Sequence, residues 1–352
     1  MTRTTPPRPA DITAVLAQLT PLARTATRLH PRPGSPSTRH SSVGGPLLWP
    51  AAEPWPRCDG PHELDGVNPP TPLPDLRLER RIRAAAHGRT LTQQERETLA
   101  RIRPERDGPV TQPPAPQPYA GSMAMLPVAQ LYVRDVPGLR APAGADVLQM
   151  LWCPFDHPPD QYMPRTALFW RTAAEVIDIL STPPEPPVTQ FAGYLPEPCL
   201  IAPEQVTEYP DLMELNEETQ DRLADGSTWQ AAGTALDSSY APAPQEFYRD
   251  ALSVAPGWKV GGWASWGLTD PAPQRCPACD TAMEPLLTIT TGEWNESTHS
   301  WIPYEDRTAA SATGHGHPDP CHPTAVQIGR GHSQQLYICP AAPEHPHTEL
   351  MQ

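Results

Sequence analysis

Val43-Gly44-Gly45-Pro46-Leu47-Leu48-Trp49-Pro50 returns late in the chain as Val260-Gly261-Gly262-Trp263-Ala264-Ser265-Trp266-Gly267. The opening valines and the shared tryptophans of the two stretches are separated by the same number of positions. Two further segments recur in the same order, residues 125–131 as 283–289 and residues 150–154 as 336–340. The sequence therefore predicts one unit that is present twice, with insertions of unequal length.

The composition favours short strands over long helices. The chain has 352 residues, of which 38% are hydrophobic and 51 are prolines. Proline lacks the N–H that helix interiors and central strands require. Five runs are rich in β-branched, aromatic or leucine residues, as strands are: 124–133, 146–152, 166–171, 286–291 and 334–339. We therefore predict a mostly β protein, α+β by content, with two pseudo-symmetric antiparallel β units from an internal duplication and with helical insertions.

The same patterns divide the chain into four segments. Residues 1–40 are predicted to be an N-terminal helical decoration and residues 41–180 the first β unit. Residues 181–245 are predicted to be a connector with a helix at 214–223, and residues 246–352 the second β unit with a zinc knuckle. The first unit contains an insertion, 69–118, in which two helical patterns, at 75–87 and 92–103, precede a proline-rich linker.

The first of these helical patterns carries Arg77, Arg80, Arg81 and Arg83. A basic face of this kind can bind phosphate. Glu79 stands four residues before Arg83, which is the spacing of an ion pair on a solvated helix. The sequence leaves both interpretations open.

Charge and hydropathy limit the classes of partner that the protein can bind. The formal net charge is −14, whereas a sequence-independent nucleic-acid binder needs a basic surface. No run approaches the ~20 apolar residues of a membrane span, and the N-terminus lacks the apolar core of a secretory signal. We therefore expect a soluble cytoplasmic protein that binds neither nucleic acid nor membrane. Its seven cysteines are then expected to be reduced rather than paired in disulfides.

The strongest chemical signal lies in the second unit. Cys276-Pro277-Ala278-Cys279 is a C-x2-C knuckle, and Cys339 with His345 or His347 completes four ligands for a tetrahedral zinc ion. Two cysteines at this spacing can direct both thiolates at one ion. A redox dithiol would normally sit at a strand-to-helix turn, and no helix start follows Cys279. Two unligated structural thiols remain a third interpretation.

The first unit holds cysteine–histidine pairs at the corresponding places. Cys58 and His62 follow the first Val-Gly-Gly stretch, Cys153 occupies the place of Cys339 in the segment that matches 336–340, and His157 comes four residues after Cys153. Together they predict a second, Cys2His2 zinc site. A buried Cys153 beside Trp152 is also an ordinary core residue, so the pairs alone do not decide between metal binding and packing.

A further group of possible ligands lies between Gly314 and Pro323. His315, His317, Cys321 and His322 stand in a stretch with several prolines. They can bind a transition metal weakly, or they can belong to a polar loop that no helix or strand holds in a fixed geometry.

The sequence offers no catalytic constellation. His62-Glu63 lacks the second histidine of H-E-x-x-H, and Gly329-Arg330-Gly331 lacks the third glycine of a dinucleotide-binding loop. An enzymatic alternative is a zinc hydrolase with one open metal position, in which Glu284 or Glu344 acts as the base.

Aromatic residues suggest where a protein partner could bind. Trp49, Trp55, Trp263 and Trp266 flank the repeated glycine pairs. Tryptophan is frequent at binding hot spots, so these four residues are candidates for an apolar contact surface. Packing in the core against the glycine pairs is the alternative.

The motifs resemble two known families. Val43-Gly44-Gly45 with Trp49-Pro50 and Trp55-Pro56, followed by residues 126–131 and 147–149, is similar to the YwqG-like proteins of bacteria, a family of unknown function. Residues 259–262, Cys276-x2-Cys279 and residues 337–340 resemble the eukaryotic programmed cell death 2 proteins and their ribosome-assembly relatives. The resemblance implies an all-β fold made by duplication of a strand-exchanging unit, and it implies chaperone-like protein binding for the eukaryotic branch. The helical insertion, the connector and the histidine-rich stretch depart from that pattern.

These observations lead to one functional hypothesis and two alternatives. We expect a non-enzymatic protein that binds an unknown protein client, as a chaperone does, and carries structural zinc. The first alternative is the zinc hydrolase. The second is an immunity-type protein whose acidic surface binds a basic toxin.

Overall fold

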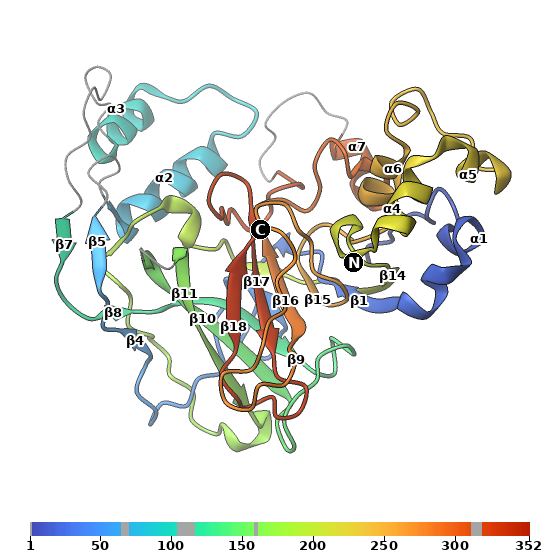
Figure 1. Ribbon diagram of the computed structural model, residues 1–352. Coiled ribbons are helices and arrows are strands. Elements are labelled where there is room, and N and C mark those ends of the chain that lie inside the picture. The colour runs from blue at the N-terminus through green and yellow to red at the C-terminus, as the bar shows by residue number, and fades with distance from the viewer. Residues whose placement is uncertain (1, 65–69, 104–116, 158–160, 311–318) are drawn as a thin grey trace.

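The computed structural model describes residues 2–64, 70–103, 117–157, 161–310 and 319–352, and these form an α+β fold. Two antiparallel sheets of six strands lie at the centre, with one group of helices on either side (Figure 1). Among the described residues, no helix is both long enough and apolar enough to span a membrane. The expected α+β content and antiparallel pairing are therefore confirmed.

The first sheet has the strand order β11-β10-β9-β3-β13-β2. Its strands are β2 (Arg32–Pro33), β3 (Ser42–Val43), β9 (Leu126–Tyr132), β10 (Val147–His157), β11 (Gln161–Arg171) and β13 (Cys199–Leu200). Three two-stranded pairs accompany it: β4 (Arg57–Cys58) with β8 (Met123–Ala124), β5 (His62–Leu64) with β7 (Gln117–Tyr119), and β6 (Thr71–Pro72) with β12 (Val188–Thr189).

The second sheet has the strand order β14-β1-β15-β16-β17-β18. Its strands are β1 (Arg24–Arg28), β14 (Glu204–Glu208), β15 (Lys259–Gly261), β16 (Glu284–Thr290), β17 (Ser333–Ile338) and β18 (Thr348–Met351). All five strand-like runs of the sequence fall in strands of the two sheets or in the adjoining β8. The short strands β1, β2, β13, β14, β15 and β18 were not predicted, because two to five residues carry too little alternation to be recognised.

Each half of the chain lends strands to the other sheet. β1 precedes all strands of the first sheet, yet it pairs with β15 of the second. β13 lies in the predicted connector, yet it pairs with β3 of the first sheet. The edge strands follow the same rule, since β14 pairs with β1 and β2 pairs with β13. The predicted N-terminal decoration and connector therefore contribute strands as well as helices.

The two sheets also share their register. The register of β10 and β9 shifts after Met150, which pairs with Ala129, because Val128 of β9 is an extra residue. The register of β17 and β16 shifts in the same way after Leu336, which pairs with Leu287, because Leu286 of β16 is an extra residue. These residues occupy equivalent places in the repeated segments, so the irregularity falls at the same position in both sheets. In both sheets the cysteine three positions beyond the paired residue, Cys153 or Cys339, belongs to a metal-ligand cluster.

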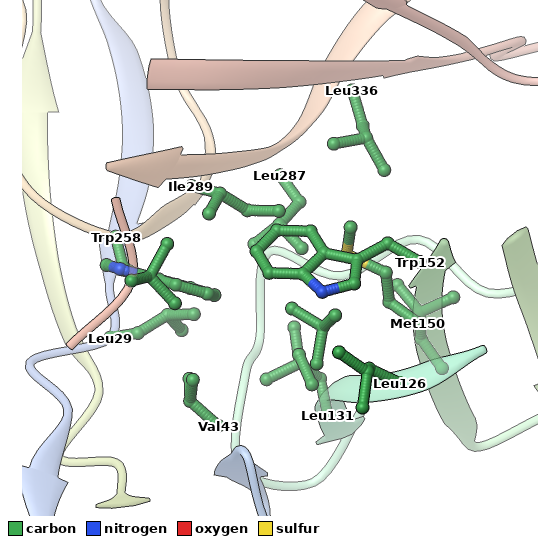
Figure 2. Packing of buried hydrophobic residues seen from close by; sticks show 14 of the residues in the cluster. Leu29, Val43, Leu126, Leu131, Met150, Trp152, Trp258, Leu287, Ile289 and Leu336 are labelled. Atoms are coloured by element: carbon green, nitrogen blue, oxygen red, sulfur yellow. The ribbon is translucent and has the colours of Figure 1, made fainter. Parts of the chain in front are cut away.

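The main core lies between the two sheets. Figure 2 shows Trp152 of β10 between Leu287 and Ile289 of the second sheet and Leu126 and Leu131 of the first. All five side chains are buried. Burying a large apolar side chain contributes roughly 1.5–3 kcal/mol, so this shared cluster holds the two halves together.

A buried ion pair explains the second glycine of the later Val-Gly-Gly stretch. Lys259 Nζ lies 2.6 and 2.8 Å from the two carboxylate oxygens of Glu208, and both side chains are almost fully buried. The N–H groups of Ala255 and Trp263 donate to the same carboxylate. A Cβ atom at Gly262 would lie only 2.2 Å from Glu208 Oε2, and its φ of +75° also favours glycine.

Helices flank the sheets on both sides (Figure 1). The insertion forms α2 (Leu73–Ala85) and α3 (Gln93–Ile102), close to the two predicted helical patterns. The second group comprises α1 (Ile12–Val15), α4 (Glu217–Ala224), α5 (Gly226–Ala231) and α6 (Pro244–Ala251), which share a separate apolar core. α7 (Arg307–Ala310) is a single turn. The helical part of the predicted N-terminal decoration, residues 1–40, ends at Leu22, because β1 begins at Arg24.

The arginines of α2 make ion pairs rather than a free basic face. Arg77 pairs with Glu185, and Arg83 pairs with Glu79 at the predicted spacing. Arg80 donates to Glu197. Three of the four cations are thus neutralised by nearby carboxylates, which favours the interpretation as a structural helix face.

Candidate metal centres

Four residues of the first half converge on one point, which we call site 1: Cys58, His62, Cys153 and His157. Their ligand atoms all lie within 4.8 Å of one another. Cys58 Sγ is 3.6 Å from His157 Nε2, and Cys153 Sγ is 3.2 Å from His62 Nε2. All four side chains are buried. The structure thus brings together both predicted cysteine–histidine pairs.

The ligands of site 1 lie on strands or at strand ends. Cys58 ends β4 and His62 begins β5, so the chain must reverse between them. Gly60 makes this turn with a φ of +87°, where a Cβ atom would meet the His62 amide nitrogen at 2.9 Å. β10 supplies the other two ligands, and its register shifts between Trp152 and Asp156. Local turn chemistry and a strand irregularity therefore position the four groups.

The second half contains the equivalent cluster, site 2: Cys276, Cys279, Cys339 and His345. Its ligand atoms also lie within 4.8 Å of one another. Cys276 Sγ is 3.4 Å from His345 Nδ1, and Cys279 Sγ is 3.6 Å from Cys339 Sγ. Cys276 and Cys339 are buried, His345 is half-buried and Cys279 is exposed.

The knuckle of site 2 is a compact backbone turn. The N–H of Asp280 donates to the carbonyl of Cys276, and the N–H of Cys276 donates to the carbonyl of Thr281, both at 2.9 Å. Asp280 adopts a left-handed conformation with a φ of +56°, which aspartate tolerates better than most residues. The turn therefore points the two thiols of the C-x2-C sequence the same way.

His345, not His347, belongs to site 2. The sequence left the two histidines as alternatives for the fourth ligand. His347 Nε2 lies 2.7 Å from Thr166 Oγ1 on β11, and burial lowers the pKa of His347. This histidine instead joins the edges of the two sheets.

The donor sets fit a zinc ion. With Zn–S bonds of ~2.3 Å and Zn–N bonds of ~2.0–2.1 Å, the ligands of a tetrahedral ion lie about 3.3–3.8 Å apart. The four contacts within the sites span 3.2 to 3.6 Å. All seven cysteines are free, so a disulfide does not account for the Cys279–Cys339 approach. Each group can therefore hold a metal ion such as zinc.

The pKa shifts of the thiols are also consistent with metal binding. In site 1, hydrogen bonds with Cys153 first, and then with both histidines, lower the pKa of Cys58. Burial raises the pKa of the Cys153 thiol. In site 2, the hydroxyl and N–H of Thr281 lower the pKa of Cys279 to about 6, and burial raises that of Cys339. Each site favours one thiolate, and a bound cation would stabilise both.

The remaining cysteines and histidines form no such group among the described residues. Cys199 donates to the carbonyl of Pro323, and Cys321 donates to the carbonyl of Trp294. His322 Nδ1 lies 2.8 Å from the carboxylate of Asp319. His315 and His317 lie outside the described residues, so the predicted weak site cannot be assembled from Cys321 and His322 alone.

The four candidate interaction tryptophans lie mainly in the interior. Trp49, Trp55 and Trp266 are 0%, 7% and 8% exposed. Each indole N–H has an internal acceptor, respectively the carbonyls of Glu53 and Met125 and the carboxylate of Glu214. Trp263 is half-buried beneath the guanidinium of Arg24. The burial of Trp49, Trp55 and Trp266 favours core packing, the alternative that the sequence left open, whereas Trp263 stays partly accessible.

The candidate bases of the hydrolase alternative have other surroundings. Glu284 begins β16 and pairs with Arg140 at 2.9 Å. Glu344 is exposed, next to the ligand His345. Each site brings together four residues that could hold a metal ion, and four protein ligands are typical of structural rather than catalytic zinc sites.

Comparisons with known proteins add no evidence on function to this geometry. No protein-family model matches the chain, and no curated protein matches it.

Several structurally important residues escaped the sequence analysis. Gly60 and Thr281 shape the two sites, but a single glycine or threonine beside a cysteine has no distinctive pattern. Gln149 and Gln335 are another case. Each is buried in its sheet and donates to a carbonyl of the repeated stretch, Leu48 and Ser265 respectively. Their equivalent positions in the repeat were the available signal.

Proposed function

We propose that this protein is a non-catalytic, protein-binding protein whose two halves arose by internal duplication and are each closed by one structural zinc ion. The single observation that carries this proposal is the pair of four-residue clusters, because each offers a complete set of sulfur and imidazole ligands. Matching strand orders, matching bulges and equivalent glutamine contacts support the duplication.

Zinc in such a site stabilises the fold rather than activating water. Four protein ligands leave no coordination position for a substrate. The ligands of each site come from segments far apart in the sequence, so one ion would cross-link a β-turn to a central strand. Metal binding would then be part of the folding free energy of each half.

Metal analysis of the purified chain tests this proposal. We expect two zinc ions per chain by plasma mass spectrometry. X-ray absorption should give four-coordinate zinc with a mixed sulfur and nitrogen shell. Cys153→Ser and Cys339→Ser should each lower the content to one, whereas Cys199→Ser, a buried thiol outside both sites, should leave two. A shell with bound water would favour the hydrolase.

The proposed protein binding is supported by other observations than the metal clusters. The resemblance to YwqG-like and programmed cell death 2 proteins suggests it, and the closed ligand sets leave the candidate centres no catalytic role. The net charge of −14 suits a basic partner. Chemical cross-linking in the native host followed by mass spectrometry should recover a protein at a constant stoichiometry. Recovery of no protein above a control that lacks the chain would contradict this part of the proposal.

A further inference from the structure

A cleft of about 780 Å³ opens between the two halves beside site 1, because Glu63 and Asp156 of its lining adjoin the ligands His62 and His157. One wall comes from Asp156 of β10 and Tyr162 of β11. Residues 190–194, from the segment between the halves, form another wall. Residues 327–332 and Met351 of the second half close it. Clefts of this size between structural units are the usual location of ligand sites.

The walls are largely apolar. Phe191, Ala192 and Met351 line the cleft and are packed against the main core. The ring of Phe191 meets that of buried Tyr194 edge to face, with centroids 5.4 Å apart. Tyr162 also lines the cleft, with 66% of its surface exposed. An aromatic or long aliphatic group can therefore be covered on several sides.

Gln190 supplies a hydrogen-bond donor without a protein acceptor. The residue is 7% exposed and lines the cleft. Its Oε1 accepts from the N–H of Asp156 at 2.8 Å, which fixes the orientation of the amide. Its Nε2 has no hydrogen-bond partner among the residues that the structure describes. A buried donor left unpaired is unfavourable, so a ligand acceptor is the natural complement.

A sharp turn adds cationic character to the cleft. Gly329 and Gly331, with φ values of +49° and +105°, flank Arg330. Neither Arg330 nor His332 has a side-chain hydrogen bond or ion pair within the described ranges. The nearby carboxylate of Asp156 already accepts from the Tyr194 hydroxyl at 2.5 Å. Glu63 is the other acid of the lining. The free donors therefore favour a ligand with a carboxylate.

The position of the cleft favours an extended chain. β11 and β18 are the outermost strands of the two sheets, and Thr166 of β11 joins them through His347 and Glu349. Beyond that contact, Tyr162 and Met351 bring the two edges into the cleft. Edge strands present unpaired N–H and C=O groups to which a peptide can hydrogen-bond. A small carboxylate would use only the side chains, whereas an extended peptide can use both edges.

We propose that this cleft binds an extended peptide segment of a protein partner. An aromatic or long aliphatic side chain of the peptide packs against Phe191 and Met351. A neighbouring carboxylate accepts from the Gln190 amide and the Arg330 guanidinium. This inference rests on the proposed protein-binding function and assigns its recognition site.

Phage display of short random peptides on the zinc-loaded full chain tests the inference. We expect enrichment of peptides that place an apolar residue next to an acidic residue or a free C-terminus. Fluorescein-labelled copies of the enriched peptide should bind Arg330→Ala and Gln190→Glu about tenfold more weakly or worse. Gln190→Glu keeps an acceptor for the Asp156 N–H, and it replaces the amide donor with a carboxylate oxygen that repels a ligand carboxylate. Arg81→Ala, an exposed arginine on α2 with no described partner, is the matched control and should bind within about twofold of the wild type.

Three outcomes would overturn the inference: no enriched peptide, enriched peptides that bind both cleft variants as well as the wild type, or binding of phenylpropionate alone. Unchanged zinc content and melting temperature in the variants exclude misfolding. Cross-linking of the native partner by Arg330→Ala at wild-type yield would reject the cleft while leaving the proposed protein-binding function intact.

Discussion

Sites 1 and 2 occupy equivalent places in two matching sheets, yet they differ in burial and composition. Site 1 has two cysteines and two histidines, all buried. Site 2 has three cysteines and one histidine, and Cys279 is exposed. In site 1 each cysteine contacts a histidine, whereas site 2 is built around a local knuckle. The same fold position can therefore hold either an inaccessible, core-forming centre or a surface-accessible one.

The largest difference should appear when one ligand is removed from each site. Cys153→Ala should destabilise the first half by about 4 kcal/mol or more, because it removes the metal and leaves three buried polar groups unpaired. Cys339→Ala should cost less, since water can reach Cys279 and His345. Urea unfolding followed by tryptophan fluorescence measures both changes.

Cys199→Ala is the control for this pair, because Cys199 is equally buried but lies outside both sites. It should cost no more than a cavity of one sulfur atom, about 1–2 kcal/mol. Equal losses for Cys153→Ala and Cys199→Ala would mean that site 1 contributes packing alone.

A second difference concerns metal exchange. A chelator can attack site 2 through exposed Cys279, but it reaches site 1 only after local opening of the core. We expect one zinc ion to transfer to 4-(2-pyridylazo)resorcinol at least about tenfold faster than the other. Cys279→Ser should remove the fast phase. If the fast phase persists in that variant and vanishes in Cys58→Ser, the assignment of the labile site is reversed.

Much of this comparison was accessible from the sequence. The cysteine–histidine spacing predicted both ligand sets, because a turn and a strand end can bring such residues together around one ion. The repeated segments predicted which strands correspond. The exchange of β1 and β13 could not be derived from the residues, because pairing between distant short strands leaves no local pattern. The tryptophans did not distinguish between a contact surface and core packing for a related reason, because the same residue type suits both roles.

Oxidation should follow the same order as metal exchange. Hydrogen peroxide can take two electrons from the thiolates with which Cys279 and Cys339, whose sulfurs are 3.6 Å apart, would hold a zinc ion. With two protons from solvent, the products are one disulfide, two molecules of water and the released zinc ion. Site 1 thiols are shielded by burial. Mass spectrometry after mild peroxide treatment should find the Cys279–Cys339 disulfide and one released zinc ion. A Cys58–Cys153 disulfide formed at the same rate would show that burial does not protect site 1.

The smallest expected difference lies in the paired glutamines of the two sheets. Gln149 Nε2 donates to the carbonyl of Leu48 and to Gln130 Oε1, and its own Oε1 accepts from Arg171. Gln335 donates to the carbonyl of Ser265 and accepts from the Tyr337 hydroxyl. Replacing either glutamine with leucine orphans these partners.

Gln149→Leu should therefore cost about 2–3 kcal/mol and Gln335→Leu about 1–2 kcal/mol, since an unpaired buried polar group costs ~1–3 kcal/mol and charged donors cost most. Urea unfolding of the two variants gives both values, with unchanged zinc content as the check that neither site is lost. Gln149→Met and Gln335→Met separate hydrogen bonding from packing, because methionine has nearly the shape of glutamine but lacks its donor and acceptor. If Gln335→Leu proved the more costly change, the first sheet would not depend on its larger polar network, and the equivalence of the two carbonyl contacts would be structural coincidence.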